Sequence, residues 1–279
     1  MFAVVLALAS SLSYAAGDVL AGSQTRRTSL WTVIVFSQLA GWILMALVVL
    51  ARGHPLPEEV LLPSVAAGLL SVVAIAASFQ ALAIGVMSII GPIFTLGAAV
   101  PVIVGLASGE RPSAWQLAGI AIALGGVVLA SREKSAGEHH EATSRASILL
   151  AVLCAVSYGF VMVLYARGAE SDPYWSLLVG RSTAMTVFAL AFAVMRPGLK
   201  VTRATAVPVL AVGVFETGGI TLFSVASTLG YLSIVAVLSS VYPVFLALLA
   251  YVFVHERLSR TQQLGIATAL VGVAVIAAG

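Results

Sequence analysis

The chain has 279 residues, of which 61% are hydrophobic and only 9% carry a charge as Asp, Glu, Lys or Arg. Soluble domains carry about 25% charged residues, so a soluble fold of this composition would expose large apolar patches. The mean hydropathy of +1.09 points the same way. These figures exclude a cytosolic enzyme and a disordered chain. They also exclude a nucleic-acid-binding protein, because the net charge of +3 is scattered between apolar runs.

Long runs without charge predict helices that cross a membrane. A helix needs about 20 apolar residues to cross the bilayer core, whereas barrel strands are shorter and alternate with polar residues, which no run here does. Two runs of about 50 residues are too long for one span, so each is expected to be a hairpin, turning at Gly85 or at residues 229–231. The predicted helices cover residues 2–22, 30–51, 61–84, 87–108, 113–131, 147–167, 173–195, 204–228, 231–254 and 261–278.

The two halves of the chain repeat each other on either side of a polar linker. The first half is expected to cover residues 1–131, the linker 132–146 and the second half 147–279. Aligned without gaps, residues 108–127 and 254–273 share 11 of 20 residues. The shared residues include Glu-Arg, Ser and Gln in register, which apolar bias alone does not produce.

The upstream parts of the halves also correspond, since Tyr14 and Tyr158 each follow a serine in the first helix of a half. Each half has five predicted helices, and an odd number inserts the second copy upside down. Inverted repeats of this kind are typical of secondary transporters, because they create two half-sites that face opposite sides of the membrane. The predicted fold is an all-α membrane protein with ten transmembrane helices, arranged as two inverted five-helix repeats.

The paired tails of the two halves resemble a known family. GERPS…Q…G (Gly109–Gly119) and HERLS…Q…G (His255–Gly265) are similar to the tails of ten-helix EamA-type members of the drug/metabolite transporter superfamily. In that family each tail follows a helix that contains a proline. In the second half of this chain that proline is Pro243, whereas the first half has Gly97 at the matching place. The resemblance implies a transporter of small molecules. It leaves amino acids, cations, nucleotide-linked metabolites and lipophilic drugs open as substrates.

Polar side chains inside the predicted helices mark a candidate substrate-binding site. A charge at a helix centre costs roughly 2.5–3.5 kcal/mol on insertion scales and usually faces a cavity or a partner. Arg181 and Glu216 indicate either a substrate site, with the guanidinium for a carboxylate and Glu216 for an amine or a proton, or a structural ion pair. Asp18 either pairs with the nearby arginines or is a residue at the mouth of the substrate path or a proton carrier. The other candidates, for which helix-to-helix hydrogen bonding is the alternative, are Tyr14, Gln38, Trp42, Gln80, Tyr158 and Tyr242.

Other patterns are interpreted as structural. The single cysteine, Cys154, excludes an intramolecular disulfide and is expected to pack in its helix. His139 and His140 are adjacent and lack the spacing of metal ligands, so no metal or cofactor is expected. The first helix begins almost at Met1 without a basic segment, which favours a retained span over a signal peptide. Stripes of small residues are expected to pack the fifth helix on the tenth: Gly119, Ala123 and Gly126 with Gly265, Ala269 and Gly272.

The sequence therefore predicts a secondary transporter, and not an enzyme. Its expected cargo is a small amphipathic or zwitterionic metabolite such as an amino acid, exported by alternating access, with a proton as the candidate coupling ion. An exporter of organic cations or lipophilic drugs is the first alternative, and a passive channel or an intramembrane enzyme is the second. Motifs of intramembrane proteases and the phosphate-binding loop of primary pumps are absent from the sequence. The expected form is a monomer in the plasma membrane.

The positive charges indicate an orientation. Ten of the fourteen Lys and Arg residues lie in loops 1–2, 5–6, 7–8 and 9–10, and only three lie in the opposite loops. The positive-inside rule places the first set, which includes residues 132–145, in the cytoplasm and both termini outside. The family resemblance implies both termini inside, so the two indications disagree, and we follow the charge bias.

A cysteine in the linker tests this orientation. Ser135→Cys is expected to resist an impermeant thiol reagent applied to intact cells, because the charge bias places the linker in the cytoplasm. Permeabilised cells are expected to label, and the unaltered chain, whose only cysteine is Cys154, gives the background. Ready labelling in intact cells would reverse the assignment.

Overall fold

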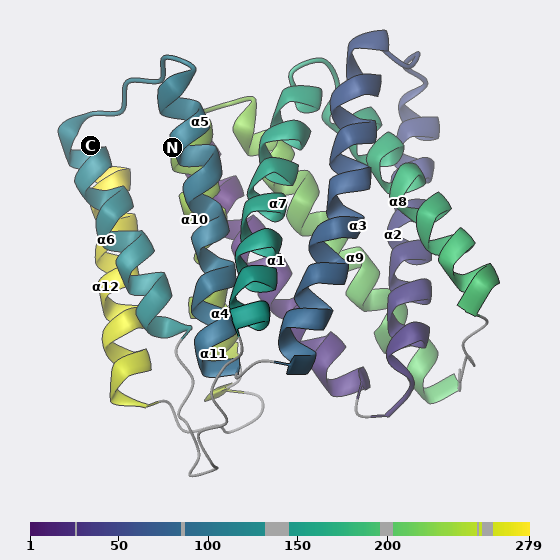
Figure 1. Cartoon of the computed structure of the whole chain (residues 1–279). Helices are drawn as coiled ribbons and strands as arrows, with labels where there is room; N and C mark the ends of the chain where they lie inside the picture. The colour runs from purple at the N-terminus through teal and green to yellow at the C-terminus, as the bar shows by residue number, and fades with distance from the viewer. Residues whose placement is uncertain (26, 85–86, 132–144, 196–202, 250, 253–258) are drawn as a thin grey trace.

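The apolar runs form helices throughout the part of the chain that the structure describes. The structure, a computed structural model, describes residues 1–25, 27–84, 87–131, 145–195, 203–249, 251–252 and 259–279 (Figure 1). A backbone inside lipid must satisfy its own N–H and C=O groups, and a helix does this within one segment. The helices are α1 (Phe2–Thr25), α2 (Leu30–Arg52), α3 (Leu61–Ile84), α4 (Met87–Thr95), α5 (Ala99–Ala107), α6 (Ala114–Ala130), α7 (Arg145–Ala169), α8 (Pro173–Met195), α9 (Arg203–Ser227), α10 (Leu232–Ser239), α11 (Tyr242–Leu249) and α12 (Arg260–Ala278), with the 3₁₀ segments η1 (Glu58–Val60) and η2 (Leu96–Ala98).

These helices make ten spans, as the sequence predicts. Eight described segments are long and apolar enough to cross a membrane, and two shorter apolar helices, Pro92–Ala107 and Ala114–Ala130, complete the set. The second predicted hairpin turns at residues 228–231, as expected. Gly85, the other predicted turn, and most of the linker, with His139 and His140, lie outside the described residues.

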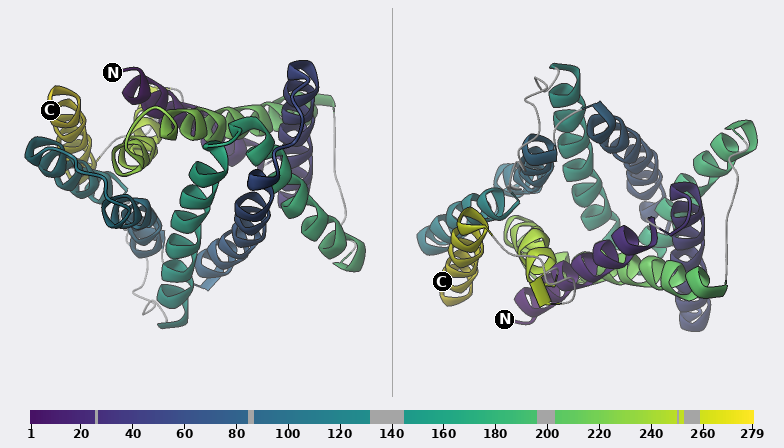
Figure 2. Two further views of the ribbon diagram at one scale, coloured as in Figure 1. Left: turned by 90° about the horizontal axis from the view of Figure 1, so that it is seen from above. Right: turned by 90° about the horizontal axis from the view of Figure 1, so that it is seen from below.

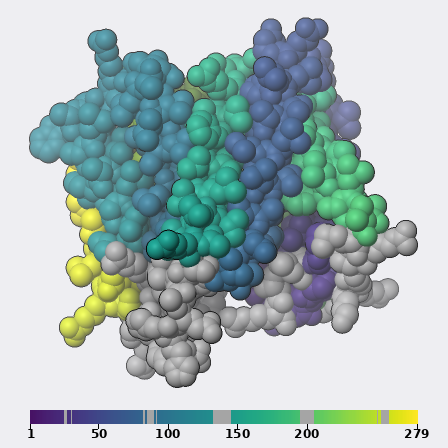
Figure 3. Space-filling view, in the orientation of Figure 1, coloured from purple at the N-terminus to yellow at the C-terminus, as the bar shows by residue number. Residues whose placement is uncertain are grey.

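The outside of the bundle is apolar, as a surface in contact with lipid must be. Leu62 on α3, Leu149 on α7 and Val194 on α8 are largely exposed. In the space-filling view, α3, α6, α7 and α8 form one continuous outer surface (Figure 3). Exposed leucine and valine on several adjacent spans fit a helical protein embedded in a bilayer.

The two halves pack as an inverted pair. The first helix of each half lies along the third span of the other half, so that α1 packs on α9 and α7 packs on α3. Close contacts recur at equivalent places: Gly68 on α3 lies against the carbonyl of Gly180, and Gly213 on α9 lies against the carbonyl of Ser37. In both further views α6 and α12 lie at one end of the bundle and α2 and α8 at the other (Figure 2).

The stripes of small residues pack α6 on α12, which confirms the sequence prediction. A Cβ added at Gly126 would meet the backbone of Ala269, and one added at Gly272 would meet the backbone of Ala123. Without these glycines the two backbones would be held apart. Dispersion forces and close packing drive helix association in lipid, so this contact fixes the end of the bundle.

A repeated N-cap explains why serine and glutamine recur in the two tails. The Ser113 hydroxyl accepts a hydrogen bond from the Gln116 backbone N–H at 3.1 Å, and the Gln116 side chain accepts one from Ser113 N at 2.9 Å. Ser259 and Gln262 form the same capping box at the start of α12. Two backbone donors at each helix start are thereby satisfied.

Two equivalent spans are broken, where the sequence predicts one helix each. The fourth span divides into α4 and α5 at the η2 turn, and the ninth divides into α10 and α11 at residues 240–241. Pro243, which has no N–H, follows the second break. The Ser11 hydroxyl lies 2.7 Å from the carbonyl oxygens of Leu238 and Ser239, so α1 satisfies groups that the break releases.

One face of the bundle carries both chain ends, and we call it the terminal face. Gly230, in the turn before α10, lies against Ala3, and Gly279 lies against Trp115. At this face Asp172 forms an ion pair with Arg52, at 2.7 Å, and accepts hydrogen bonds from the first N–H groups of α8. The Arg52 guanidinium also stands 4.3 Å from the centroid of the Tyr174 ring. These contacts bind the end of α2 to the start of α8.

Adding a methyl group to the α6–α12 contact tests its role. Gly126→Ala is expected to destabilise the protein by about 1–3 kcal/mol, because the new Cβ overlaps the α12 backbone. Gly125→Ala is the matched control, since a Cβ there meets nothing within 4 Å. Thermal unfolding in detergent measures both. Equal unfolding temperatures for the two variants would show that the close approach of α6 and α12 at Gly126 does not hold these helices together.

Candidate functional site

Two tyrosines from equivalent positions meet near the middle of the bundle. The phenol groups of Tyr14 on α1 and Tyr158 on α7 come close enough to interact. The Tyr14 ring packs on Gly219 of α9, where an added Cβ would lie only 3.0 Å from the ring. Equivalent residues of two halves touch only near the pseudo-two-fold axis, so this pair marks the junction of the two repeats.

Two carboxylates lie beside the tyrosine pair. Asp18, one turn beyond Tyr14 on α1, and Glu216 on α9 act electrostatically on each other and on Tyr158. Gly17 on α1 lies beside Glu216, and an ideal Cβ at position 17 would stand 3.6 Å from the Glu216 Cγ, an ordinary van der Waals distance. Arg26, a candidate partner for Asp18 in the sequence, lies outside the described residues.

Arg181 on α8 brings a positive charge to the same neighbourhood. Its Nη1 donates a hydrogen bond to Oε1 of Gln38 on α2 at 2.9 Å. It acts electrostatically on Glu216 and Tyr14 but forms no ion pair with Glu216, since Arg52–Asp172 is the one salt bridge in the described ranges. Gly41 leaves space for the guanidinium, because an added Cβ would lie 2.7 Å from Nη1.

Tyr242 joins the cluster from the broken ninth span. It begins α11 directly after the break and lies within electrostatic range of Asp18 and Tyr158. Cys154, which the sequence suggests is only a packing residue, also lies near Tyr158 and Tyr242. The cluster thus receives side chains from six helices: α1, α2, α7, α8, α9 and α11.

Two of the sequence candidates have other positions. Trp42 donates a hydrogen bond from Nε1 to the Ser182 hydroxyl at 2.8 Å, which links α2 to α8 next to Arg181. Gln80 is exposed near the end of α3, and no contact with the cluster is seen for it in the described structure. The structure therefore brings together seven candidates, with Trp42 at their edge: Tyr14, Asp18, Gln38, Tyr158, Arg181, Glu216 and Tyr242.

One member of this neighbourhood was not predicted. Tyr165 lies two turns after Tyr158 on α7, packs over Gly180 and acts electrostatically with Arg181. The spacing of seven residues puts both tyrosines on the same face of α7, and that spacing is the signal that could have identified it.

The chemistry of the cluster suits a small molecule with charged and apolar parts. Guanidinium and amide groups bind carboxylates, carboxylates bind amines, and tyrosine rings cover apolar or cationic groups. Although they lie deep in their helices, Asp18 and Tyr158 keep exposed surface, 41% in the case of Tyr158. Among the described residues no group of His, Cys, Asp and Glu is arranged to hold a metal ion.

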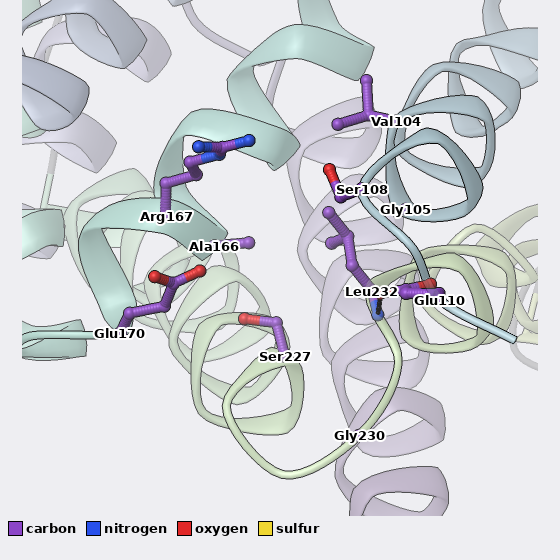
Figure 4. Close-up of a pocket in the computed structure, with 10 residues that line it drawn as sticks. All are labelled: Val104, Gly105, Ser108, Glu110, Ala166, Arg167, Glu170, Ser227, Gly230 and Leu232. Atoms are coloured by element: carbon purple, nitrogen blue, oxygen red, sulfur yellow. Dashed lines mark hydrogen bonds between the residues drawn. The ribbon is translucent and has the colours of Figure 1, made fainter.

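A separate cavity of about 320 Å³ lies at the terminal face (Figure 4). Figure 4 shows Arg167 and Glu170 on one side of it and Ser108 and Glu110 on the other, with Ser227 below. It lies at the C-terminal ends of α7 and α9, one helix length from Arg145 at the start of α7.

Comparison with known proteins agrees with this architecture. A model of the EamA-like transporter family matches residues 1–132 and again residues 145–278. A search of curated proteins finds no match. This chain is similar to a solved structure titled "Crystal structure of protein", with a TM-score of 0.81 over 98% of this chain and 95% of that chain. The two sequences are 21% identical, so the likeness shows the fold alone. The chain belongs to the EamA-like transporter family of the drug/metabolite transporter superfamily, whose members are membrane transporters of small molecules and not enzymes.

Proposed function

We propose that this transporter exports a small zwitterionic metabolite, such as an amino acid, by alternating access. The observation that carries the proposal is the cluster at the junction of the two inverted halves. There a guanidinium bound to an amide, two carboxylates and a pair of tyrosines come together from both repeats. Secondary transporters bind their substrates at such repeat interfaces and beside broken helices.

Arg181 is the proposed partner of the substrate carboxylate. An arginine has five N–H donors in a planar fork that matches a carboxylate. Gln38 takes one hydrogen bond from Nη1, and the described structure shows no further hydrogen bond from this guanidinium. The remaining donors are thus available to a substrate, while Gln38 holds the group in place.

Glu216 and Asp18 are the proposed partners of the substrate amine. They approach each other from α9 and α1, so one ammonium group can lie near both carboxylates. Two neighbouring carboxylates repel each other, and this pair is also the proposed place of a coupling proton. Tyr14, Tyr158 and Tyr242 would surround the apolar part of the substrate.

An organic cation is the second candidate substrate. The cluster contains two carboxylates and one guanidinium, so its carboxylates outnumber its positive groups and favour a cation. Arg181, hydrogen-bonded to Gln38, would then have no substrate group to bind. The two candidates differ in their need for Arg181: a zwitterion needs it, whereas a cation does not.

Transport by purified protein in proteoliposomes tests the proposal. A thermal-shift screen against amino acids, quaternary amines and sugar phosphates first selects ligands, because a ligand that binds only the folded state stabilises it. Saturable counterflow of a labelled zwitterion is expected for a carrier. Linear, non-saturable flux would identify a channel, and the absence of flux for every ligand selected would contradict transport of these classes.

Replacing both charges separates a substrate site from a structural pair. Arg181→Met with Glu216→Leu removes two charges that cost roughly 5–7 kcal/mol unpaired in the membrane, so the double variant is expected to fold. It is expected to lose transport by at least tenfold, because both ends of the zwitterion lose their partners. Arg181→Lys should also weaken binding, since a bidentate contact is lost. Unchanged uptake by the double variant, at normal yield, would remove both residues from the site.

Crowding the guanidinium tests the place of Arg181 without altering its charge. Gly41→Ala places a Cβ 2.7 Å from Nη1 of Arg181 and still closer to the Thr217 hydroxyl. It is therefore combined with Thr217→Ala, which removes the hydroxyl and leaves the guanidinium as the group that must move, and Thr217→Ala alone is measured beside it. We expect the KM for a zwitterion to rise by about tenfold, or 1.4 kcal/mol of binding free energy. Gly22→Ala is the matched control, because nothing lies within 4 Å of its added Cβ. If both variants transport like the parent, Arg181 does not hold the substrate from its observed position.

A further inference from the structure

Glu110 joins the two halves at the terminal face. It lies in the turn between α5 and α6 of the first half. Its carboxylate accepts hydrogen bonds from the backbone N–H groups of Leu232 and Ser233, at 2.6 and 3.0 Å, and from the Ser233 hydroxyl at 2.5 Å. Leu232 and Ser233 begin α10 of the second half, so the carboxylate caps that helix at the positive end of its dipole.

The turn is shaped to present this carboxylate. The Glu110 backbone N–H donates to the carbonyl of Gly105 at 3.1 Å. Gly105 also leaves space for the side chain, since an added Cβ would lie 2.8 Å from the carboxyl carbon of Glu110. Gly109, next to Glu110, has a φ of 96°, a backbone conformation that only glycine adopts readily.

Helix α10 connects this contact to the candidate site. It is a rod of eight residues, about 12 Å long, between the end that Glu110 caps and the break at residues 240–241. Tyr242 follows the break and belongs to the cluster. Ser11 of the first half holds the carbonyls at the break. Rotation of one half against the other therefore has to separate Glu110 from α10.

The cavity of about 320 Å³ lies beside this contact (Figure 4). Glu110 and Leu232 line one side of it, and Ala166 at the end of α7 lines the other. Ala166 is only 7% exposed. The same helix α7 carries Tyr165 and Tyr158, which belong to the neighbourhood of the cluster, so the cavity lies at the terminal-face end of a helix that leads to the site.

We propose that Glu110 is the latch of a gate on the terminal face. In the structure the latch is closed: its carboxylate holds the start of α10 against the α5–α6 turn. When it opens, water takes the place of the carboxylate on the first N–H groups of α10, α10 swings away, and the cavity becomes the vestibule of the binding cluster. The latch rests on the proposed function, because a gate serves alternating access.

Covalent closure distinguishes a latch from a fixed strut. Glu110→Cys with Ser233→Cys is made in a chain that also carries Cys154→Ala, so that no native thiol reacts. It is reconstituted in proteoliposomes and bridged by a short, reducible bifunctional thiol reagent. A latch that must open predicts a loss of transport of at least twentyfold on bridging and recovery after reduction. The two variants with one added cysteine, in the same Cys154→Ala chain, are the controls, and treatment with the reagent should leave the rate of each unchanged from its own untreated value. Full transport by the bridged protein would overturn the proposal.

Accessibility of Ala166 tests the latch without measuring transport. In Ala166→Cys with Cys154→Ala, which leaves one thiol, alkylation by an impermeant reagent is expected to be at least fivefold faster when Glu110→Gln is added, because the amide weakens the cap and releases α10. Glu170→Gln is the matched control, since it lines the same cavity and its side chain forms no hydrogen bond in the described structure. Equal alkylation rates with Glu110→Gln would contradict the latch. A parent protein that transports nothing, but shows the expected alkylation, would instead contradict the proposed function.

Discussion

Close approach of helix backbones is the constraint on which the rest of this structure depends. Lipid tails are as apolar as leucine, so helices in a bilayer are not driven together by the hydrophobic effect and must gain from close packing and hydrogen bonds. Here glycine supplies the packing at equivalent interfaces: Gly68 and Gly213 in the third spans, and Gly126 and Gly272 in the last spans. Most of these contacts join one half to the other, so the repeat is also the means of assembly.

The same close packing gives the polar cluster its geometry. Gly41 makes room for the Arg181 guanidinium and Gly219 for the Tyr14 ring. Charged groups that would be costly in lipid thereby lie between helices, where each meets other polar groups. Serine hydroxyls of α1 extend this network to the backbone, at Gly219 and at the break of the ninth span. The site is therefore fixed by backbone positions of several spans.

Much of the fold could be predicted because it leaves compositional or repeated signals. The spans follow from apolar runs, and their inversion follows from five helices per half. The correspondence of Tyr14 and Tyr158 follows from the repeat, but their meeting does not, because equivalent residues touch only where they lie near the two-fold axis. Helix faces were harder to predict. Gln80 lies in a helix that is apolar all round, so the sequence does not indicate which side it faces.

Glu110 shows a second limit of sequence reasoning. The tail motif that contains Glu110 is visible in both halves of the sequence. Its partner Leu232 lies 122 residues further along the chain, at the start of α10, and nothing in the sequence near Leu232 indicates the contact. The same holds for Arg181 and Gln38, which are 143 residues apart. Pairings of this kind come from the tertiary fold and not from local pattern. Broken spans were hidden for a similar reason, because α10 and α11 form one continuous apolar run in the sequence.

The pairing of α6 with α12 also has a consequence for biosynthesis. The ribosome makes α6 near the middle of the chain and α12 at its end, and synthesis at about 5–20 residues per second separates the two by roughly 7–30 s. During that time the glycine face of α6 meets lipid or a chaperone, because its partner does not yet exist. α1 and α3 likewise wait for α9 and α7. The first five spans are therefore inserted before most of their final neighbours, and tertiary folding is completed only as the last helix leaves the translocon.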